Sequence, residues 1–309
     1  MWIYVWDSEI KGIYLWDTPV KEVYLWDTKI RPTILPNWLC FTANTAWSTV
    51  KLNKVYTPTE VTLETSTDWN TRTTYSMWST ITLSSIWDKV YFRNTSETDT
   101  WFSVSTGWYY KFAMTWSIAW SGDVTYLLNK NGTDTLSDYC FIYLFQGCPL
   151  TTAPELPATN LANSCYAAMF NKASLTVAPE LPAATLAQYC YENMFSKSSL
   201  TTPPELPATT LADACCHQMF YQCTNLEALP KLPATSLPKN CYNAMFHSCS
   251  KIKLSTTKTW GYQTAYRIPT SWTGTTGTNS LANMFYRTWW TRTGTPSVNT
   301  IYYTSNTVV

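Results

Sequence analysis

The chain has 309 residues, enough for two domains or for one long array of repeats with a buried core. Charged residues make up 13% of it, and the formal net charge is +1. This balance argues against a nucleic-acid partner, which would need a basic face to neutralise phosphates. No apolar run approaches the roughly 18 residues of a membrane span, and no secretory signal is visible at the N-terminus.

Three units of a ten-residue repeat begin at Ile3, Ile13 and Val23. Each unit has a β-branched or aromatic triplet, an Asp-Ser or Asp-Thr break, and a short apolar–basic return. This pattern is typical of very short strands joined by tight turns. Ten residues cannot close a core, so residues 1–35 are predicted to form β-repeats that stack on one another, on the next domain, or on a partner in an assembly.

Residues 36–128 are rich in Thr, Ser, Val and Tyr, and apolar and polar residues alternate in short runs such as 49–52, 80–83 and 89–92. Turn-prone clusters separate these runs at intervals of about ten residues. The pattern predicts an antiparallel β-sandwich of the immunoglobulin-like kind.

Residues 129–254 carry a longer repeat, with a period of about 25 residues. Its motif Pro-Glu-Leu-Pro-Ala begins at Pro154, Pro179 and Pro204, and Pro-Lys-Leu-Pro-Ala begins at Pro230. Three other residue types recur in step with it: Cys140, Cys165, Cys190, Cys215 and Cys241; Phe145, Phe170, Phe195, Phe220 and Phe246; and Leu150, Leu175, Leu200 and Leu226. This agreement is a strong signal of stacked units.

Each unit is predicted to contain an extended segment and a short helix. Leu161, Cys165 and Met169 lie at i, i+4 and i+8, the spacing of one helix face. Such a unit leaves its apolar side exposed unless a neighbour covers it, so the units are expected to stack into a right-handed solenoid. Residues 255–309 are predicted to form a degenerate repeat and a C-terminal cap.

The unit Leu-Thr-x-Ala-Pro-Glu-Leu-Pro-Ala-Thr-x-Leu-Ala-x-x-Cys-Tyr-x-x-Met-Phe resembles the BspA-type leucine-rich repeats of bacterial surface proteins. The N-terminal Tyr-Leu-x-Asp-Thr element is similar to short repeats that precede such arrays in bacterial and phage surface proteins. The expected fold class is therefore mixed β and α/β: N-terminal short β-repeats and an antiparallel β-sandwich, followed by a leucine-rich-repeat solenoid. The resemblance implies a non-enzymatic protein at the cell surface or outside the cell.

The leading functional hypothesis is adhesion or protein interaction, in which the solenoid binds a protein or glycan on a cell surface. One alternative is a phage tail or virion-associated protein that recognises the host. Others are a carbohydrate-binding module on the Trp-rich β region and a surface-glycan hydrolase, which would need two carboxylates within about 10 Å. No catalytic, cofactor-binding or metal-ligating residue is assigned, because phosphate-loop, nucleophile-elbow and dinucleotide motifs are missing from the sequence. The cysteines keep the repeat period and are expected to be free core thiols.

The interaction surface is assigned to exposed residues of the extended segments: Thr151, Thr152, Glu155, Thr176, Glu180, Thr201, Thr202 and Glu205. The three glutamates share one position of the repeat, which Lys231 occupies in the fourth unit. This row is interpreted either as a solvated face that keeps the array soluble or as a weak surface for a ligand or cation.

Tryptophan is unusually common, with 17 residues against 9 glycines, and no glycine lies between positions 13 and 106. Trp87-Asp88 stands where Gly-Asp would form a hairpin turn, and Asp68-Trp69-Asn70 stands where Asp-Gly-Asn would. We therefore hypothesise that many tryptophans are UGA codons that the organism reads as glycine. The alternative is that they are genuine and form exposed platforms for sugar or peptide binding. Trp38 is expected to be genuine.

Overall fold

The computed structural model describes residues 37–56, 61–68, 71–98, 102–271, 273–288 and 294–309, and the backbone of four short strands before them. The chain divides into two compact units, Met1–Trp38 and Leu39–Val309. In the first unit, two antiparallel pairs are described: β1 (Tyr14–Leu15) with β2 (Thr18–Pro19), and β3 (Val23–Leu25) with β4 (Thr28–Ile30). The first ten-residue repeat and the Trp-Asp pairs at 16–17 and 26–27 lie outside the described residues.

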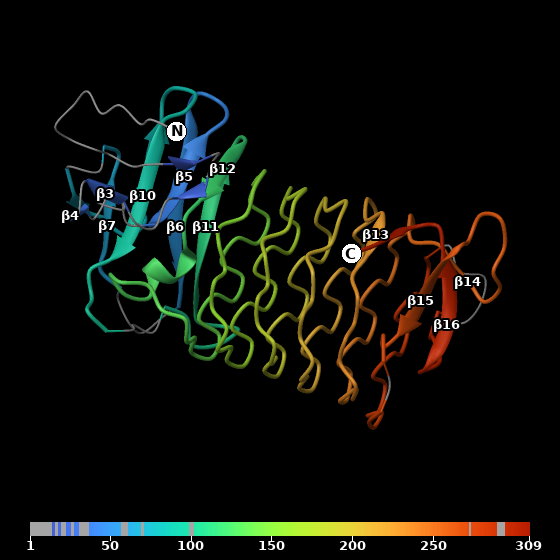
Figure 1. The fold of residues 1–309 in the computed structure, drawn as a ribbon. Helices are drawn as coiled ribbons and strands as arrows, with labels where there is room; N and C mark the ends of the chain where they lie inside the picture. The colour runs from blue at the N-terminus through green and yellow to red at the C-terminus, as the bar shows by residue number, and fades with distance from the viewer. Residues whose placement is uncertain are drawn as a thin grey trace. The chain divides into compact units, whose positions relative to one another are not determined.

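The second unit begins with two antiparallel sheets (Figure 1). One has the strand order β12-β5-β10-β7-β8 and the other has the order β11-β6-β9. Their bounds are β5 Leu39–Ala43, β6 Ser48–Val55, β7 Leu63–Ser66, β8 Thr73–Thr74, β9 Ile81–Leu83, β10 Lys89–Asn94, β11 Tyr109–Thr115 and β12 Ile118–Ser121. A single turn of 3-10 helix, η1 (Val124–Leu127), follows, and the Asp123 carboxylate accepts a hydrogen bond from Thr125 N at its start.

Alternating burial in β6 and continuous burial in parts of β5 and β10 supply the core of this β-region. In β6, Val50 and Leu52 are buried while the residues between and beside them are half-buried. Phe41 of β5 lies 5.4 Å from Phe92 of β10 and 4.9 Å from Phe112 of β11, measured between ring centroids. Because β11 belongs to the other sheet, the Phe41–Phe112 contact joins the two sheets face to face.

The repeats that follow are built from consecutive four-residue turns, which are stacked on those of the next repeat. Every fourth residue has a positive φ, as at Ser164 (54°), Ala168 (51°) and Lys172 (60°). Successive backbone N–H groups donate alternately within a turn and to the next repeat. Met169 N donates to Tyr166 O within its turn at 3.2 Å, whereas Phe170 N donates to Met194 O of the next repeat at 2.9 Å. This alternation satisfies the backbone N–H groups of a buried segment that has neither a helix nor a sheet.

The predicted fold class, mixed β and α/β with a leucine-rich-repeat solenoid, is wrong. The described residues contain no α-helix, and their strands form small, mostly antiparallel sheets, with no sheet running along the repeats. The four-residue spacing of Leu161, Cys165 and Met169 fits a chain of turns as well as it fits a helix face. Left-handed residues such as Ala168 interrupt the right-handed backbone that a helix requires. The prolines remove donors from the extended segments, where isolated bridges such as Val177↔Thr202 replace a ladder.

Stacked phenylalanines form the centre of the repeats. Successive ring centroids from Phe145 onward lie 5.4–5.8 Å apart, in the order Phe145, Phe170, Phe195, Phe220, Phe246 and Phe285. All six rings are buried, as are the periodic leucines and cysteines beside them. Full burial of one such side chain contributes about 1.5–3 kcal/mol, so this column is a major source of stability.

The stack of repeats contacts β-structure at both ends within the second unit. At one end Phe112 of β11 stacks on Phe145 at 5.4 Å, and Phe112 N bonds Leu144 O. At the other end lies the sheet β14-β16-β15, with β14 Leu254–Ser255, β15 Thr264–Ile268 and β16 Thr300–Thr304 (Figure 1). The Tyr266 hydroxyl of β15 donates to Pro230 O at 3.0 Å, and β17 (Thr307–Val308) pairs in parallel with β13 (Ala228–Leu229). No described helix has the length and apolar character needed to cross a bilayer.

Candidate functional site: a groove lined by proline and glutamate

The extended segment of each repeat alternates strictly between the core and the surface. In 179–183, Pro179, Leu181 and Ala183 are buried, whereas Glu180 and Pro182 are exposed. The same alternation holds in 154–158 and 204–208. Because the period of an extended chain is two, the Pro-Glu-Leu-Pro-Ala motif presents one glutamate and one proline per repeat on the same face.

Cavities open between successive repeats on this face. No backbone hydrogen bond joins residues 179–183 to 204–208, all of which are described, and the two prolines of each motif have no N–H to donate. A cavity of about 450 Å³ lies there, lined by Pro179, Glu180, Pro182, Pro204, Glu205 and Pro207 among others. Its volume is within the range of small-ligand and side-chain pockets.

A series of such cavities forms one groove. A second cavity, of about 430 Å³, lies one repeat earlier and shares Glu180 and Pro182 with the first. A third, of about 180 Å³, lies one repeat later and shares Glu205 and Pro207. We call this surface the Pro-Glu groove and define it by Pro154, Glu155, Pro157, Pro179, Glu180, Pro182, Pro204, Glu205, Pro207, Lys231 and Pro233.

The groove is acidic along most of its length. The exposed carboxylates of Glu180 and Glu205 have no ion-pair partner among the described residues. At the β-region end, the backbone of Glu155 bridges that of Asp123. Burial raises the pKa of the Asp123 carboxyl, and the nearby charge of Glu155 adds to the increase. At the other end Lys231 reverses the sign of the charge.

The predicted interaction residues separate into two groups. The glutamates at 155, 180 and 205 line the Pro-Glu groove, but the threonines do not. Thr151 Oγ1 donates to Ile118 O at 3.3 Å, and Thr152 Oγ1 donates to Trp120 O at 3.1 Å, so both hydroxyls attach the first repeat to β12.

The threonines of the later repeats serve the contact between one repeat and the next. Thr176 O accepts a hydrogen bond from Thr201 N at 3.5 Å, and Thr202 forms a bridge with Val177. The side chains of all three threonines are exposed beside these backbone contacts.

Sequence reasoning missed the prolines as site residues. Pro157, Pro182 and Pro207 are exposed and supply the apolar walls between the glutamates. The signal that could have identified them is the second proline of the motif, which recurs in register with the glutamate and two residues after it.

The thiols are unsuited to nucleophilic chemistry. All ten cysteines are free and buried. Burial raises the pKa of the Cys165 and Cys148 thiols to about 12 and that of Cys223 to about 11. Since the thiolate is the nucleophile, these side chains are inert near neutral pH. Within the described ranges, no three His, Cys, Asp or Glu side chains gather as a metal site would require.

The two histidines are half-buried, and neither faces the Pro-Glu groove. His217 Nδ1 lies 3.0 Å from Glu192 Oε1 of the preceding repeat. His247 packs between Tyr221 and Tyr286, at ring-centroid distances of 4.7 and 5.0 Å. Burial lowers the pKa of His247, and the charge of Arg287 lowers it further.

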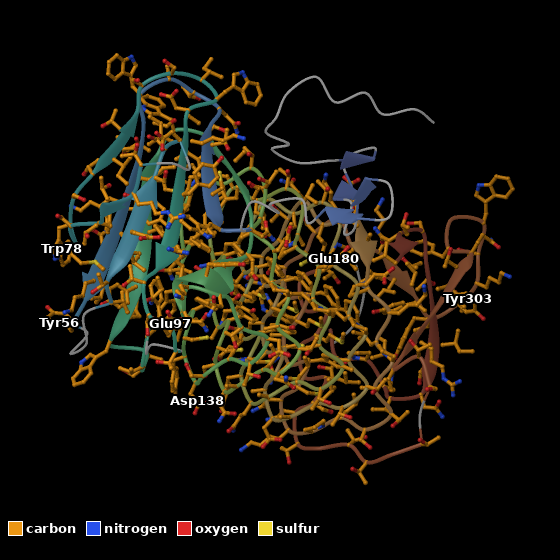
Figure 2. All side chains as sticks on the ribbon, turned by 60° about the vertical axis from the view of Figure 1, so that its left-hand side comes forward. Tyr56, Trp78, Glu97, Asp138, Glu180 and Tyr303 are labelled. Carbon is orange, nitrogen blue, oxygen red and sulfur yellow. The ribbon has the colours of Figure 1, made fainter. Side chains whose placement is uncertain are left out.

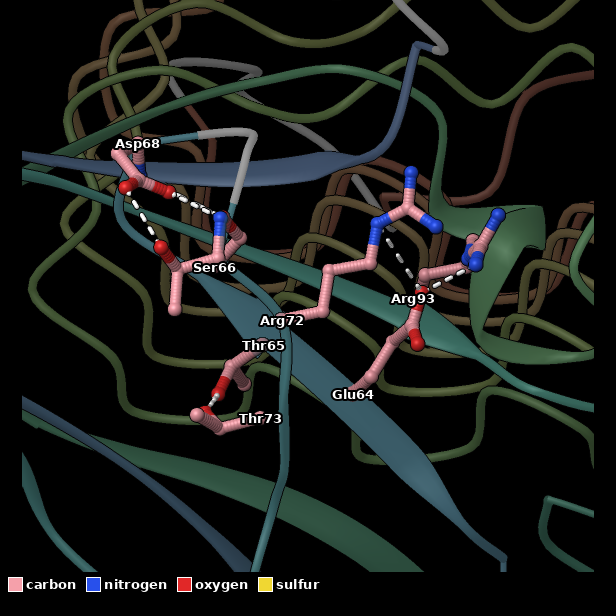
Figure 3. Close-up of polar contacts among 8 residues, drawn as sticks. Glu64, Thr65, Ser66, Asp68, Arg72, Thr73 and Arg93 are labelled. Atoms are coloured by element: carbon pink, nitrogen blue, oxygen red, sulfur yellow. Dashed lines mark hydrogen bonds and ion pairs between the residues drawn. The ribbon is translucent and has the colours of Figure 1, made fainter.

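A polar cluster on the five-stranded sheet has a structural role (Figure 3). Glu64 of β7 pairs with Arg93 of β10 and lies 4.0 Å from Arg72. Thr65 and Thr73 share a hydrogen bond of 3.3 Å between β7 and β8. With its carboxylate held by two guanidinium groups, Glu64 ties neighbouring strands together.

Three exposed tryptophans gather at one end of the β-region. Trp47 follows β5, Trp87 precedes β10 and Trp116 precedes β12. The pairings Ala43↔Ile118 and Thr42↔Lys89 bring these strand ends together, and Thr49↔Thr115 does the same in the other sheet. Trp78 is exposed as well (Figure 2).

Comparison with known proteins adds no family to this description: no family model, no curated protein and no solved structure matches the chain.

Proposed function

We propose that the chain is a non-enzymatic recognition protein whose Pro-Glu groove binds an extended segment of a partner protein. The observation that carries this proposal is the row of cavities, repeated in register and connected by shared glutamates and prolines. The groove offers carboxylates, proline rings and one ammonium group, and its defining residues include neither a thiol nor an imidazole. Such a set is suited to holding a ligand.

The chemistry of the groove selects lysine and arginine side chains. Their aliphatic stems pack against proline rings while the charged head remains at the wet surface. Exposed carboxylates such as those of Glu180 and Glu205 attract that head. The positive charge of Lys231 would favour an acidic residue at one end of the bound segment. This preference would fix the orientation of the segment along the groove.

The spacing of the repeats suits an extended peptide that runs along the stack. Two residues of an extended chain advance by about 6.6 Å. Successive Phe rings, which report the distance between repeats, lie 5.7 and 5.8 Å apart in the middle of the stack. Alternate side chains of a bound peptide would therefore meet successive repeats over a short stretch.

The resemblance to repeats of bacterial surface proteins supports a partner that is displayed on a cell surface. The same groove would serve a virion-associated protein that recognises its host. In both cases the proposed event is binding through the groove.

Titration calorimetry with a short peptide of alternating Lys and Ala tests this function. We expect binding that weakens when salt is raised from about 0.05 to 0.5 M, because exposed charges are screened. In the double variant E180Q/E205Q, the loss of two exposed ion pairs is expected to weaken binding by about 2- to 30-fold.

The matched control is E97Q, which removes an exposed carboxylate of the β-region outside the groove. It should bind the Lys-Ala peptide as the unsubstituted chain does, and a Glu-Ala peptide should not bind to either. Equal affinity of the E180Q/E205Q variant and the unsubstituted chain would contradict the proposal.

A further inference from the structure

Four tryptophans of the β-region have a backbone conformation that usually requires glycine. In the described part of 37–121, five residues other than glycine have a positive φ. Four of them are Trp47 (65°), Trp78 (72°), Trp87 (74°) and Trp116 (61°), and the fifth is Tyr56. A positive φ is uncommon for any residue with a side chain, and a bulky residue there is an outlier.

Two of these tryptophans occupy turn positions that select glycine. Trp78 is the third residue of the turn 76–79, which is closed by a hydrogen bond of 2.9 Å from Ser79 N to Ser76 O. Trp87 is the third residue of the turn 85–88, where Asp88 N bonds Ser85 O at 3.2 Å. A four-residue turn with a positive φ at its third residue takes glycine, or asparagine, at that position.

The indole rings gain little in exchange for this strain. The four side chains are 67%, 53%, 73% and 64% exposed, in chain order. Lys51 Nζ lies 5.6 Å from the centroid of the Trp78 ring, an exposed cation–π contact of the weak kind. The rings therefore do not explain the backbone conformation.

Two other tryptophans in the same region are buried in the core. Trp120, in β12, is 5% exposed, with its ring centroid 3.8 Å from that of Phe145 and 4.4 Å from that of Phe41. Trp38 is 1% exposed. Neither has a positive φ.

Left-handed residues in the repeats show a different pattern. The position of Lys172 is occupied by Gly147, Lys197 and Gln222 in neighbouring repeats, all with positive φ. There the stacked backbone imposes the conformation on several residue types. In the β-region the turns differ from one another, and yet tryptophan recurs in four of them.

We propose that positions 47, 78, 87 and 116 are glycine in the natural protein, and that positions 38 and 120 are tryptophan. The cause that fits is a UGA codon read as glycine at the four turns. The cluster of Trp47, Trp87 and Trp116 is then not an aromatic platform, so the natural β-region does not bind sugars by ring stacking there. This inference does not depend on the Pro-Glu groove.

A peptide mass map of the protein isolated from the organism that carries the gene tests the proposal directly. Each peptide that covers one of the four turns should be lighter by the difference between a tryptophan and a glycine residue. The peptides that contain positions 38 and 120 should have the mass expected for tryptophan. Tryptophan at the four turn positions in the natural protein would overturn the proposal.

Thermal unfolding of recombinant chains tests the physical argument separately. The variant W47G/W78G/W87G/W116G should unfold at a higher temperature than the chain with four tryptophans, by about 1–2 °C for each relieved turn. The matched control, W120G, should unfold at a lower temperature because it empties a buried site. A quadruple variant that unfolds at the same or a lower temperature than the tryptophan chain would overturn the strain argument.

Discussion

Phe170 and Phe195 lie parallel in adjacent repeats, with ring centroids 5.7 Å apart and an angle of 3° between the ring planes. Both rings are fully buried, and each also stacks on the ring of its other neighbour. The column therefore has no gap into which surrounding side chains could relax. Truncation of one ring removes contacts on both of its sides.

We expect Phe195→Ala to lower the free energy of unfolding by about 3–5 kcal/mol, the usual effect of a large-to-small change in a packed core. Urea denaturation followed by circular dichroism measures this loss. Val177→Ala, at an exposed position, is the control and should change the stability by less than about 0.5 kcal/mol. A loss for Phe195→Ala as small as that of the control would mean that the column does not support the stack.

The positive-φ positions of the repeats predict stabilising glycines. Lys172 is exposed with a φ of 60°, and Gly147 occupies the equivalent position one repeat earlier. A left-handed residue with a side chain is disfavoured by about 1–2 kcal/mol, whereas glycine loses about 0.5–1 kcal/mol of backbone entropy. Lys172→Gly should therefore raise the free energy of unfolding by about 0.5–1 kcal/mol in urea titrations.

Ser174→Gly is the matched control for this prediction. Ser174 is exposed two residues later, and its φ is not positive. There glycine brings only its entropic loss, so the substitution should destabilise the chain by about 0.5–1 kcal/mol. If both glycines shift the unfolding midpoint in the same direction, the left-handed conformation of Lys172 is contradicted.

The sequence indicates part of the β-region well because strands such as β6 follow the period-two rule, although Val90, Tyr91 and Phe92 of β10 are all buried. The alternating runs at 49–52 and 89–92 lie within β6 and β10. The sequence of the repeats is ambiguous, since a spacing of four is shared by a helix and by consecutive four-residue turns. Left-handed residues at 164, 168 and 172 distinguish the turns from a helix. Serine, alanine and lysine, which occupy these positions, do not predict a left-handed conformation.

The candidate site was predictable in part for a similar reason. The glutamates at 155, 180 and 205 repeat in register, so their row follows from the period alone. The role of the exposed prolines depends on the absence of backbone hydrogen bonds between successive Pro-Glu-Leu-Pro-Ala segments such as 179–183 and 204–208, which only the structure shows. The hydrogen bonds of Thr151 and Thr152 to β12 depend on how the β-region docks on the first repeat, and no local pattern encodes that docking.

Buried thiols predict a loss of stability at alkaline pH. In the folded chain the pKa of Cys223 is about 11, against an ordinary value of 9.0. The unfolded state therefore releases this proton first as the pH rises above 9, and the folded state loses stability until the pH reaches about 11. The expected decline is up to about 1.4 kcal/mol per pH unit for each such thiol.

Urea titrations at a series of pH values from neutral to alkaline measure this decline. Cys223→Ala should show a shallower decline. Its stability near pH 7 should fall by about 1 kcal/mol, because the buried thiol donates to Phe195 O at 3.0 Å, so the slopes with pH are compared and not the absolute values. An equal slope for this variant and the unsubstituted chain would show that Cys223 titrates normally in the folded state.

The cover at the C-terminal end of the stack predicts the effect of losing a single hydrogen bond. Tyr266 is buried, and its hydroxyl donates to Pro230 O at 3.0 Å, joining β15 to the fourth Pro-x-Leu-Pro segment. Tyr266→Phe keeps the ring but leaves that carbonyl without this donor, which should lower the free energy of unfolding by about 1–2 kcal/mol. Because the cover shields the last repeats, hydrogen exchange at the amides of Leu237 and Tyr242 should also accelerate. Tyr303→Phe, at a half-buried position in β16, is the control and should leave both measurements unchanged. If exchange also accelerates throughout the β-region, the variant destabilises the whole unit. That result would contradict a local effect of Tyr266 on the last repeats.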